Sequence, residues 1–194
     1  MAAVPTPAPV RAAPRIVAFI GSAHPAKAHL LVDSVCEALL SGFGLNVERR
    51  DLSNAGSGSG LLTLDRAALD EGWRDLVAAI EDCDGLVVGM PVFQGSYPGL
   101  FKHVFDLIHP AALRNKPVLL TAVGGGLRHS LMVEHQLRPL FGFFEAATVS
   151  SSIYACTEEI VAGRAPSGLL AARIANATAQ FAALTLRPAT RANP

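Results

Sequence analysis

Three short apolar runs, each followed at once by glycine or proline, constrain the fold of this chain most strongly. They are RIVAFI at 15–20, GLVVGM at 85–90 and PVLLTAV at 117–123. Strands that are apolar on both faces are typical of a parallel sheet covered by helices on both sides. Two more segments are predicted to be strands, NVERRDL at 46–52 and ATVSSSIYA at 147–155.

Apolar residues at helical spacing follow each predicted strand. These helical stripes are Leu31, Val35 and Leu39, ended by Gly42; Leu69, Trp73, Leu76, Val77 and Ile80, from Asp65 to near Cys83; Leu100, Val104, Phe105 and Ile108; Val133, Leu137, Leu140 and Phe141; and Leu170, Ile174, Ala177, Phe181 and Leu184. Right-handed crossovers through five such units predict a doubly wound α/β domain. We expect five parallel strands in the order 2-1-3-4-5, with helices on both faces.

The length of 194 residues, about half of them apolar, suits one hydrophobic core and is short for two ordinary domains. We therefore expect one domain at 15–186. A disordered Pro- and Ala-rich tail is predicted at 1–14, a flexible tail at 187–194, and a surface loop at 53–60. No run is long and apolar enough for a secretory signal or a membrane span. Three cysteines, far apart in the sequence, predict a reduced cytoplasmic protein with structural thiols.

The formal net charge is zero and charged residues make up only 16% of the chain. No basic field is present to attract nucleic acid or an anionic membrane surface, so a small ligand or a dinucleotide is the favoured partner. No cysteine and histidine spacing indicates a metal site. The low charged fraction leaves much apolar surface, which predicts a homodimer or homotetramer.

In a sheet of this order, ligands bind beyond the carboxyl ends of the strands where the winding direction reverses. The loops at 21–29, 91–98 and 124–129 are the predicted binding loops. The first joins a strand to a helix N-terminus, which favours an anion such as phosphate, or is an ordinary turn. Neither GxxxxGK[ST] nor GxGxxG occurs in it, which argues against a P-loop and an ordinary dinucleotide fingerprint.

The second and third loops have residues suited to a flat ring. Phe93 and Tyr97 offer apolar contact, and the peptide groups from Gln94 to Ser96 can bond a polar ring edge, although aromatics here could equally cover the core. The triple glycine at 124–126 lets backbone approach a ligand closely, although a flexible turn would also use glycine. Three such loops at successive strand ends favour a ligand site.

From the opening GS through PVFQGSYPG to the glycine loop, the chain resembles the NAD(P)H-dependent FMN reductases of flavodoxin-like fold. The resemblance spans about residues 15–185. It is greatest to the FMN reductase components of two-component monooxygenases for alkanesulfonates and methanesulfonate, through LFKHVFDL, GGGLRHSLMVEHQLRPLFGFFEA and SSIYA. It implies FMN and NADPH or NADH as ligands, and a flavin-dependent monooxygenase as partner.

The resemblance also implies which residues surround the flavin. Those around the phosphate are Ser22, His24, Lys27, Ala28, His29 and Leu30. Those around the isoalloxazine are Pro91, Val92, Phe93, Gln94, Gly95 and Ser96, with Gly124, Gly125 and Gly126.

Two departures from the family pattern affect how tightly flavin is held. Relatives usually have serine at Lys27 and threonine or asparagine near His29, so the phosphate meets a cation here instead of hydroxyls. Val123 and Gly126 stand where relatives often carry threonines. Both departures suit a protein that handles FMN as a substrate and does not retain it.

Three further residues are candidates on the helices. His135, within MVEHQLRP, resembles the extra residue that this subgroup accommodates as a π-bulge at the subunit interface; the alternative is a solvated or interface histidine in an ordinary α-helix. Lys102 and Arg128 are candidate contacts for the phosphates of the nicotinamide dinucleotide, or are simply solvated.

The resemblance implies hydride transfer from nicotinamide C4 to flavin N5, which needs neither a nucleophile nor a metal. The amides of Gly124 to Gly126 would then stabilise charge on the reduced flavin. Three alternatives stay open: an FMN-bound reductase of quinones, azo dyes or metal ions, a flavodoxin-like electron carrier, which the neutral charge disfavours, and a flavin-dependent sensor. NADPH or NADH preference and oligomer size also stay open.

Overall fold

The computed structural model describes residues 13–22, 24, 26–53, 55, 63–166 and 168–187. Most of the predicted N-terminal tail, most of the predicted loop at 53–60 and the C-terminal tail beyond Arg187 therefore lie outside the described residues. Among the described residues, no helix is both long and apolar enough to cross a lipid bilayer.

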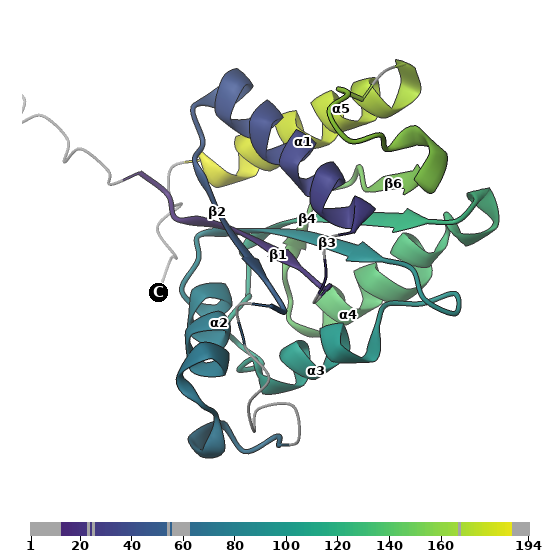
Figure 1. Ribbon diagram of the computed structural model, residues 1–194. Helices are drawn as coiled ribbons and strands as arrows, with labels where there is room; N and C mark the ends of the chain where they lie inside the picture. Colours follow the sequence, from purple (N-terminus) through teal and green to yellow (C-terminus); the bar gives the residue numbers. More distant parts are fainter. Residues whose placement is uncertain are drawn as a thin grey trace, which may run out of the picture.

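A parallel sheet forms the centre of the molecule (Figure 1). Its order is β2-β1-β3-β4-β5, which confirms the predicted order, and a further segment, β6, also pairs with β4. The strands are β1 (Ile16–Ile20), β2 (Val47–Asp51), β3 (Gly85–Pro91), β4 (Pro117–Gly124), β5 (Ala147–Thr148) and β6 (Ile153–Cys156).

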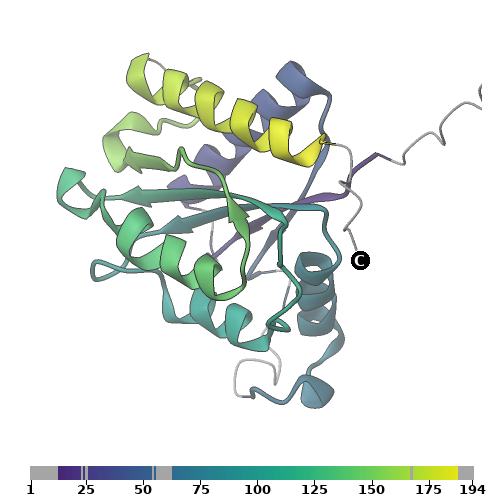
Figure 2. The same cartoon turned by 180° about the vertical axis from the view of Figure 1, so that it is seen from behind.

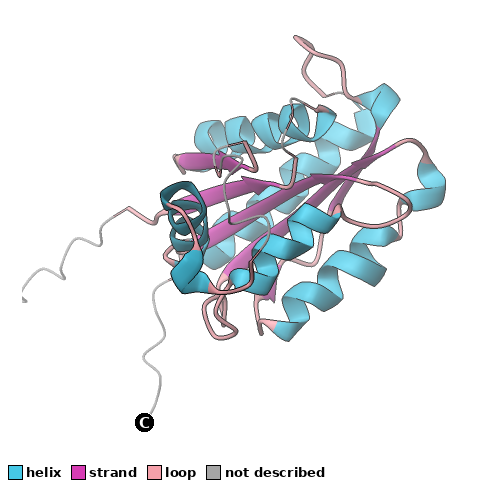
Figure 3. Ribbon diagram, turned by 60° about the horizontal axis from the view of Figure 1, so that its bottom comes forward, coloured by secondary structure: helices cyan, strands magenta, loops and turns pink. Residues whose placement is uncertain are grey.

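Helices cover both faces of this sheet, as Figures 1 and 2 show from opposite sides. On one face lie α1 (Lys27–Phe43) and α5 (Gly168–Thr185). On the other lie α2 (Glu71–Glu81), α3 (Gly99–Leu107) and α4 (Arg138–Phe143). Figure 3 shows the twist of the strands between the two helical layers.

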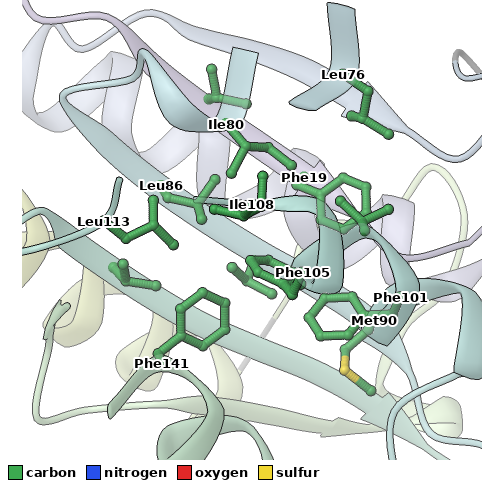
Figure 4. Close-up of a cluster of buried hydrophobic side chains, with 14 of the residues drawn as sticks. Phe19, Leu76, Ile80, Leu86, Met90, Phe101, Phe105, Ile108, Leu113 and Phe141 are labelled. Carbon is green, nitrogen blue, oxygen red and sulfur yellow. The ribbon is translucent and has the colours of Figure 1, made fainter. Parts of the chain in front are cut away.

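Each helical layer has its own hydrophobic core, because β1, β3 and β4 are buried on both faces. On the side of α2, α3 and α4, Phe101 is one of several buried aromatic rings in the cluster (Figure 4). Its ring centroid lies 5.7 Å from that of Phe19 and 4.8 Å from that of Phe105. The predicted core position Leu100 is wrong, since its side chain is 41% exposed while Phe101 is fully buried.

Two helix boundaries differ from the prediction for reasons of capping. The first helix continues through Gly42 and ends at Gly44, whose φ of 67° is the left-handed conformation that glycine adopts readily at a helix end. The second helix starts at Glu71, because the Asp70 side chain accepts a bond from the Trp73 N–H. The predicted start, Asp65, caps a separate turn of 3₁₀ helix.

The predicted fifth strand at 147–155 is split into β5 and β6. Thr148 pairs with Val118 and Ile153 pairs with Thr121. Between these two pairs the chain advances five residues in the predicted strand but only three residues in β4. Side chains bond the backbone of the extra residues: Arg138 donates to the carbonyl of Val149 at 3.0 Å. Gln180 of α5 accepts the N–H of Ser151 at 2.9 Å. The sequence pattern did not reveal the break because these partners come from α4 and α5.

Glu81 joins three elements at the opposite end of the sheet from the predicted loops. Its carboxylate accepts bonds from the Arg66 guanidinium at 2.5 and 2.8 Å and from the His109 N–H at 2.6 Å. Burial raises the pKa of Glu81, but these hydrogen bonds outweigh burial and hold that pKa below its ordinary value.

This arrangement predicts a pH dependence of stability. Because the folded pKa of Glu81 is lowered, its contribution is complete above the unfolded value, 4.5, and is lost as pH falls through the folded value. The free energy of unfolding, measured by urea titration from about pH 6 to about pH 3, should therefore fall less steeply in Glu81→Gln than in the unmodified protein. Glu37→Gln, an exposed site on α1, is the matched control; equal slopes in all three proteins would contradict the prediction.

Candidate functional site

The sheet brings the three predicted loops to one end of the molecule. The Gly21 N–H donates to the carbonyl of Gly89 at 2.8 Å, which joins the end of β1 to the end of β3. The Val92 N–H donates to the carbonyl of Val123 at 2.8 Å, which joins the end of β3 to the end of β4. The loops that follow these strands therefore lie side by side, as predicted (Figure 1).

The first loop presents backbone and one cation. Ser22 Oγ donates to the carbonyl of His24 at 2.9 Å. Ala28 is buried and Leu30 half-buried, so these two could contribute only backbone groups. Lys27 is exposed, and its ammonium donates to the carbonyl of Thr157, in the turn after β6. Lys27 thus links the first loop to the turn after β6, at the same end of the sheet.

His29 has a structural role that the sequence did not reveal. Its Nδ1 accepts the N–H of Ala26 at 3.2 Å, so the ring caps the start of α1 as a glutamate does in a capping box. An accepting Nδ1 leaves the hydrogen of a neutral ring on Nε2, which lies 3.1 Å from Asp51 Oδ2. Both side-chain nitrogens of His29 therefore face protein groups.

The second loop is a tight turn between Phe93 and Ser96, whose backbones exchange two hydrogen bonds of 2.9 Å. Gln94 and Gly95 occupy it with φ of 49° and 82°. Phe93 is 59% exposed, whereas Tyr97 packs against the core with its ring centroid 5.5 Å from that of Phe101. Of the two aromatics, only Phe93 stands free of the core.

The third loop begins inside the sheet. Gly124 is the last residue of β4 and pairs with Cys156 of β6. The carbonyl of Gly126 accepts the Tyr154 hydroxyl at 2.6 Å and the His129 N–H at 3.2 Å. This contact of Tyr154 with the loop was not evident from the sequence, because only strand pairing brings β6 beside β4.

His135 lies in a π-helix, Val133–Leu137, immediately before α4. The predicted bulge is therefore present, and the side chain of His135 is exposed. Arg138, just after the π-helix, bonds Glu134 through both carboxylate oxygens, at 2.5 and 2.9 Å. These hydrogen bonds lower the pKa of Glu134. The neighbouring Gln136 accepts the hydroxyl of Ser96 at 3.4 Å, which ties the π-helix to the second loop.

The two candidate nucleotide contacts have protein partners. Lys102 pairs with Asp106 one turn further along α3. Arg128 donates to His129 Nε2 at 3.0 Å. Both side chains stand beside the binding loops, and each would have to exchange its partner to meet a phosphate.

A cavity of about 530 Å³ lies away from the three loops. It is lined by β5, the residues after it and the end of α5, near the amino end of β4. None of the predicted site residues borders it. Within the described part of the chain, no group of three or more histidine, cysteine or acidic side chains is arranged to hold a metal ion.

Comparisons with known proteins cover the part of the chain that contains the three loops. The family model described as NADPH-dependent FMN reductase matches residues 14–159. The NADH-dependent FMN reductase SfnF of Pseudomonas putida is 44% identical over 149 residues, which is 74% of this chain and 78% of SfnF. An FMN reductase (NADPH) of Pseudomonas aeruginosa is 48% identical over 119 residues, 61% of this chain and 60% of that protein.

Solved structures share the fold of this chain. An oxidoreductase from Corynebacterium diphtheriae has a TM-score of 0.78 and 31% identity, covering 90% of this chain and 98% of its own. An apo NADH:FMN oxidoreductase (EMOB) also has a TM-score of 0.78, with 25% identity, covering 92% and 94%. A flavodoxin, WrbA-like protein from Agrobacterium tumefaciens matches at 0.60 and 18% identity, which bears on the fold alone.

Proposed function

This chain belongs to the NADPH-dependent FMN reductase family, and from that premise we propose that FMN binds across the loops after β1, β3 and β4. As a member of the family it is an NAD(P)H-dependent FMN reductase. The observation that carries the proposal is the matched segment, residues 14–159, because it contains all three loops that the sheet assembles at one edge.

The first loop fits a phosphate. The N–H of His29 donates to the Ala26 carbonyl at 2.9 Å, but the N–H groups of the two residues before it stand at the open start of α1, whose positive dipole end favours an anion. Lys27 adds an exposed cation at the same point. We assign the phosphate to the backbone from Lys27 to Leu30, with Ser22 and His24 beside it, and give His29 the task of holding the helix start.

The second and third loops fit the flavin ring system. The exposed Phe93 offers an apolar face, and the turn through Gln94 and Gly95 presents peptide groups. At Gly125 a Cβ would meet no atom within 4 Å, so the backbone there is open to close approach. We assign the isoalloxazine to the residues from Pro91 to Ser96 and to the loop at 124–126.

FMN, when bound, supplies the acceptor chemistry: a C–H bond of NADPH or NADH breaks, an N–H bond forms at flavin N5, and the flavin gains negative charge. The protein's part is to bind, orient and exclude water. Backbone N–H groups of the third loop are the donors available to that charge. Lys102 and Arg128 are the proposed contacts for the dinucleotide phosphates, after exchange of their present partners.

We further propose that FMN is a diffusible substrate and that the reduced flavin passes to a monooxygenase partner. The similarity to SfnF supports this proposal. Exposed Leu127 and Leu131, 75% and 64% accessible beside the third loop, support a homodimer or homotetramer. The free cysteines support a reducing, cytoplasmic location.

The test is oxidation of NADPH and of NADH by purified protein while free FMN is titrated, first in air and then without oxygen. We expect saturable dependence on FMN, and a matching rate of flavin bleaching without oxygen. Tight FMN binding with no oxidation of either nucleotide would contradict the reductase assignment and favour an electron carrier. Activity that persists after dialysis without added FMN would instead favour a tightly bound flavin.

A further inference from the structure

The hydroxyl of Tyr154 fixes one peptide of the glycine loop. Tyr154 lies on β6, is 5% exposed, and donates to the carbonyl of Gly126 at 2.6 Å. Burial raises the pKa of Tyr154, so the hydroxyl keeps its hydrogen and acts as a donor. The Gly126 carbonyl also accepts the His129 N–H at 3.2 Å. Two donors therefore hold this carbonyl in one direction.

The direction of that carbonyl decides which backbone N–H groups face outward. Gly126 is extended, with φ 166° and ψ 165°, and the N–H and C=O of an extended residue point to the same side. Both groups of Gly126 therefore point toward Tyr154. The next peptide group is planar and trans, so the N–H of Leu127 points opposite to the Gly126 carbonyl, toward the exposed side of the loop.

Gly124 is part of the same arrangement. A Cβ at Gly124 would lie 2.2 Å from the Tyr154 hydroxyl oxygen and 3.1 Å from the ring carbon that bears it. The hydroxyl thus occupies the space that a side chain at 124 would need. The backbone of Gly124 is committed to β6 through its pairing with Cys156.

We propose that Tyr154 is a positioning residue: by fixing the Gly126 carbonyl, it aims the N–H of Leu127 at the negative charge that develops on FMN as it is reduced. This inference rests on the proposed flavin site, and it replaces Gly126 with Leu127 as the principal donor of the third loop. Fixed donors of this kind stabilise charge without reorganising during the reaction.

The test compares affinities for the two redox states of FMN. In Tyr154→Phe, we expect the dissociation constant of reduced FMN to rise about tenfold more than that of oxidised FMN, which lowers the potential of bound FMN by about 30 mV. Thr178→Val is the matched control, because Thr178 also has a buried hydroxyl bonded to a carbonyl, at 2.8 Å on α5. Its ratio of the two constants should equal that of the unmodified protein.

Three outcomes count against the inference in different ways. If Tyr154→Phe raises both dissociation constants equally, Tyr154 is a structural residue only and the inference is overturned. If the constants do not change, it is overturned as well. If the unmodified protein binds no FMN, the proposed function fails and the inference fails with it. The first two outcomes leave the proposed function intact.

A second pair of variants tests the geometry directly. Gly124→Ala should destabilise flavin binding strongly where Tyr154 is present, because of the 2.2 Å approach to its hydroxyl. In Tyr154→Phe the same change leaves a nearest approach of 3.1 Å, so its added effect should be several-fold smaller. Equal effects of Gly124→Ala in both backgrounds would contradict the assigned contact.

Discussion

Replacing Lys27 with glutamate is expected to raise the KM for FMN about hundredfold, or about 3 kcal/mol, because a carboxylate would face the flavin phosphate in place of a cation. Lys27 stands exposed at the first residue of α1, with its ammonium on the carbonyl of Thr157. Riboflavin lacks the phosphate, so its KM should change by no more than about threefold. Steady-state NAD(P)H oxidation with each flavin measures both values.

The control for charge is Arg74→Glu, which makes the same change of net charge at an exposed position on α2. It should leave both KM values unchanged. If Lys27→Glu raises the KM of riboflavin as much as that of FMN, Lys27 does not meet the phosphate and the assignment of the first loop is wrong. Raising the salt concentration should reduce the FMN effect, since exposed charges are screened.

Replacing Gly89 with alanine is expected to lower the free energy of unfolding by about 3 kcal/mol. Gly89 lies in β3, and a Cβ there would approach Val32 Cγ2 of α1 to 2.2 Å. Val32 is fully buried and β-branched, so its side chain has little freedom to move away. Urea unfolding can be followed by the fluorescence of Trp73, the single tryptophan, which is buried.

Two companion variants test the cause. Val32→Ala opens the space that a Cβ at position 89 requires. The double variant should therefore lose less free energy of unfolding than the sum of the losses in the two single variants. Gly42→Ala, inside α1 and exposed, has nothing within 4 Å of its new Cβ and should stabilise the protein by about 1 kcal/mol. Full additivity of the first pair would rule out the contact as the cause of the loss.

The common position of the three candidate loops could be predicted from the sequence because it follows from strand order. Runs such as GLVVGM at 85–90 are apolar on both faces, which restricts them to inner parallel strands, and the loops after such strands share one edge. The family resemblance also indicated an extra helical residue near His135. The structure has a π-helix at Val133–Leu137, which includes His135.

Individual side-chain roles could not be predicted in the same way. The resemblance placed His29 among the residues around the phosphate but did not indicate that its two ring nitrogens meet the Ala26 N–H and Asp51. Asp51 is 22 residues from His29 in the sequence and is not part of any motif that would have indicated the contact. Tyr154 looked like one more β-strand residue, and its contact with Gly126 spans 28 residues. Such partners become neighbours only once β2 and β6 take their places beside β1 and β4.

Sequence patterns were sufficient to predict the layer architecture, the strand order and the end of the sheet at which the loops meet. These features depend on hydrophobic periodicity and on glycine and proline at strand ends, which are local properties. The break between β5 and β6, the capping role of His29 and the contact of Tyr154 with the glycine loop became evident only from the folded structure. Each of these depends on hydrogen bonds between groups distant in the chain, whose geometry is set by packing and not by local pattern.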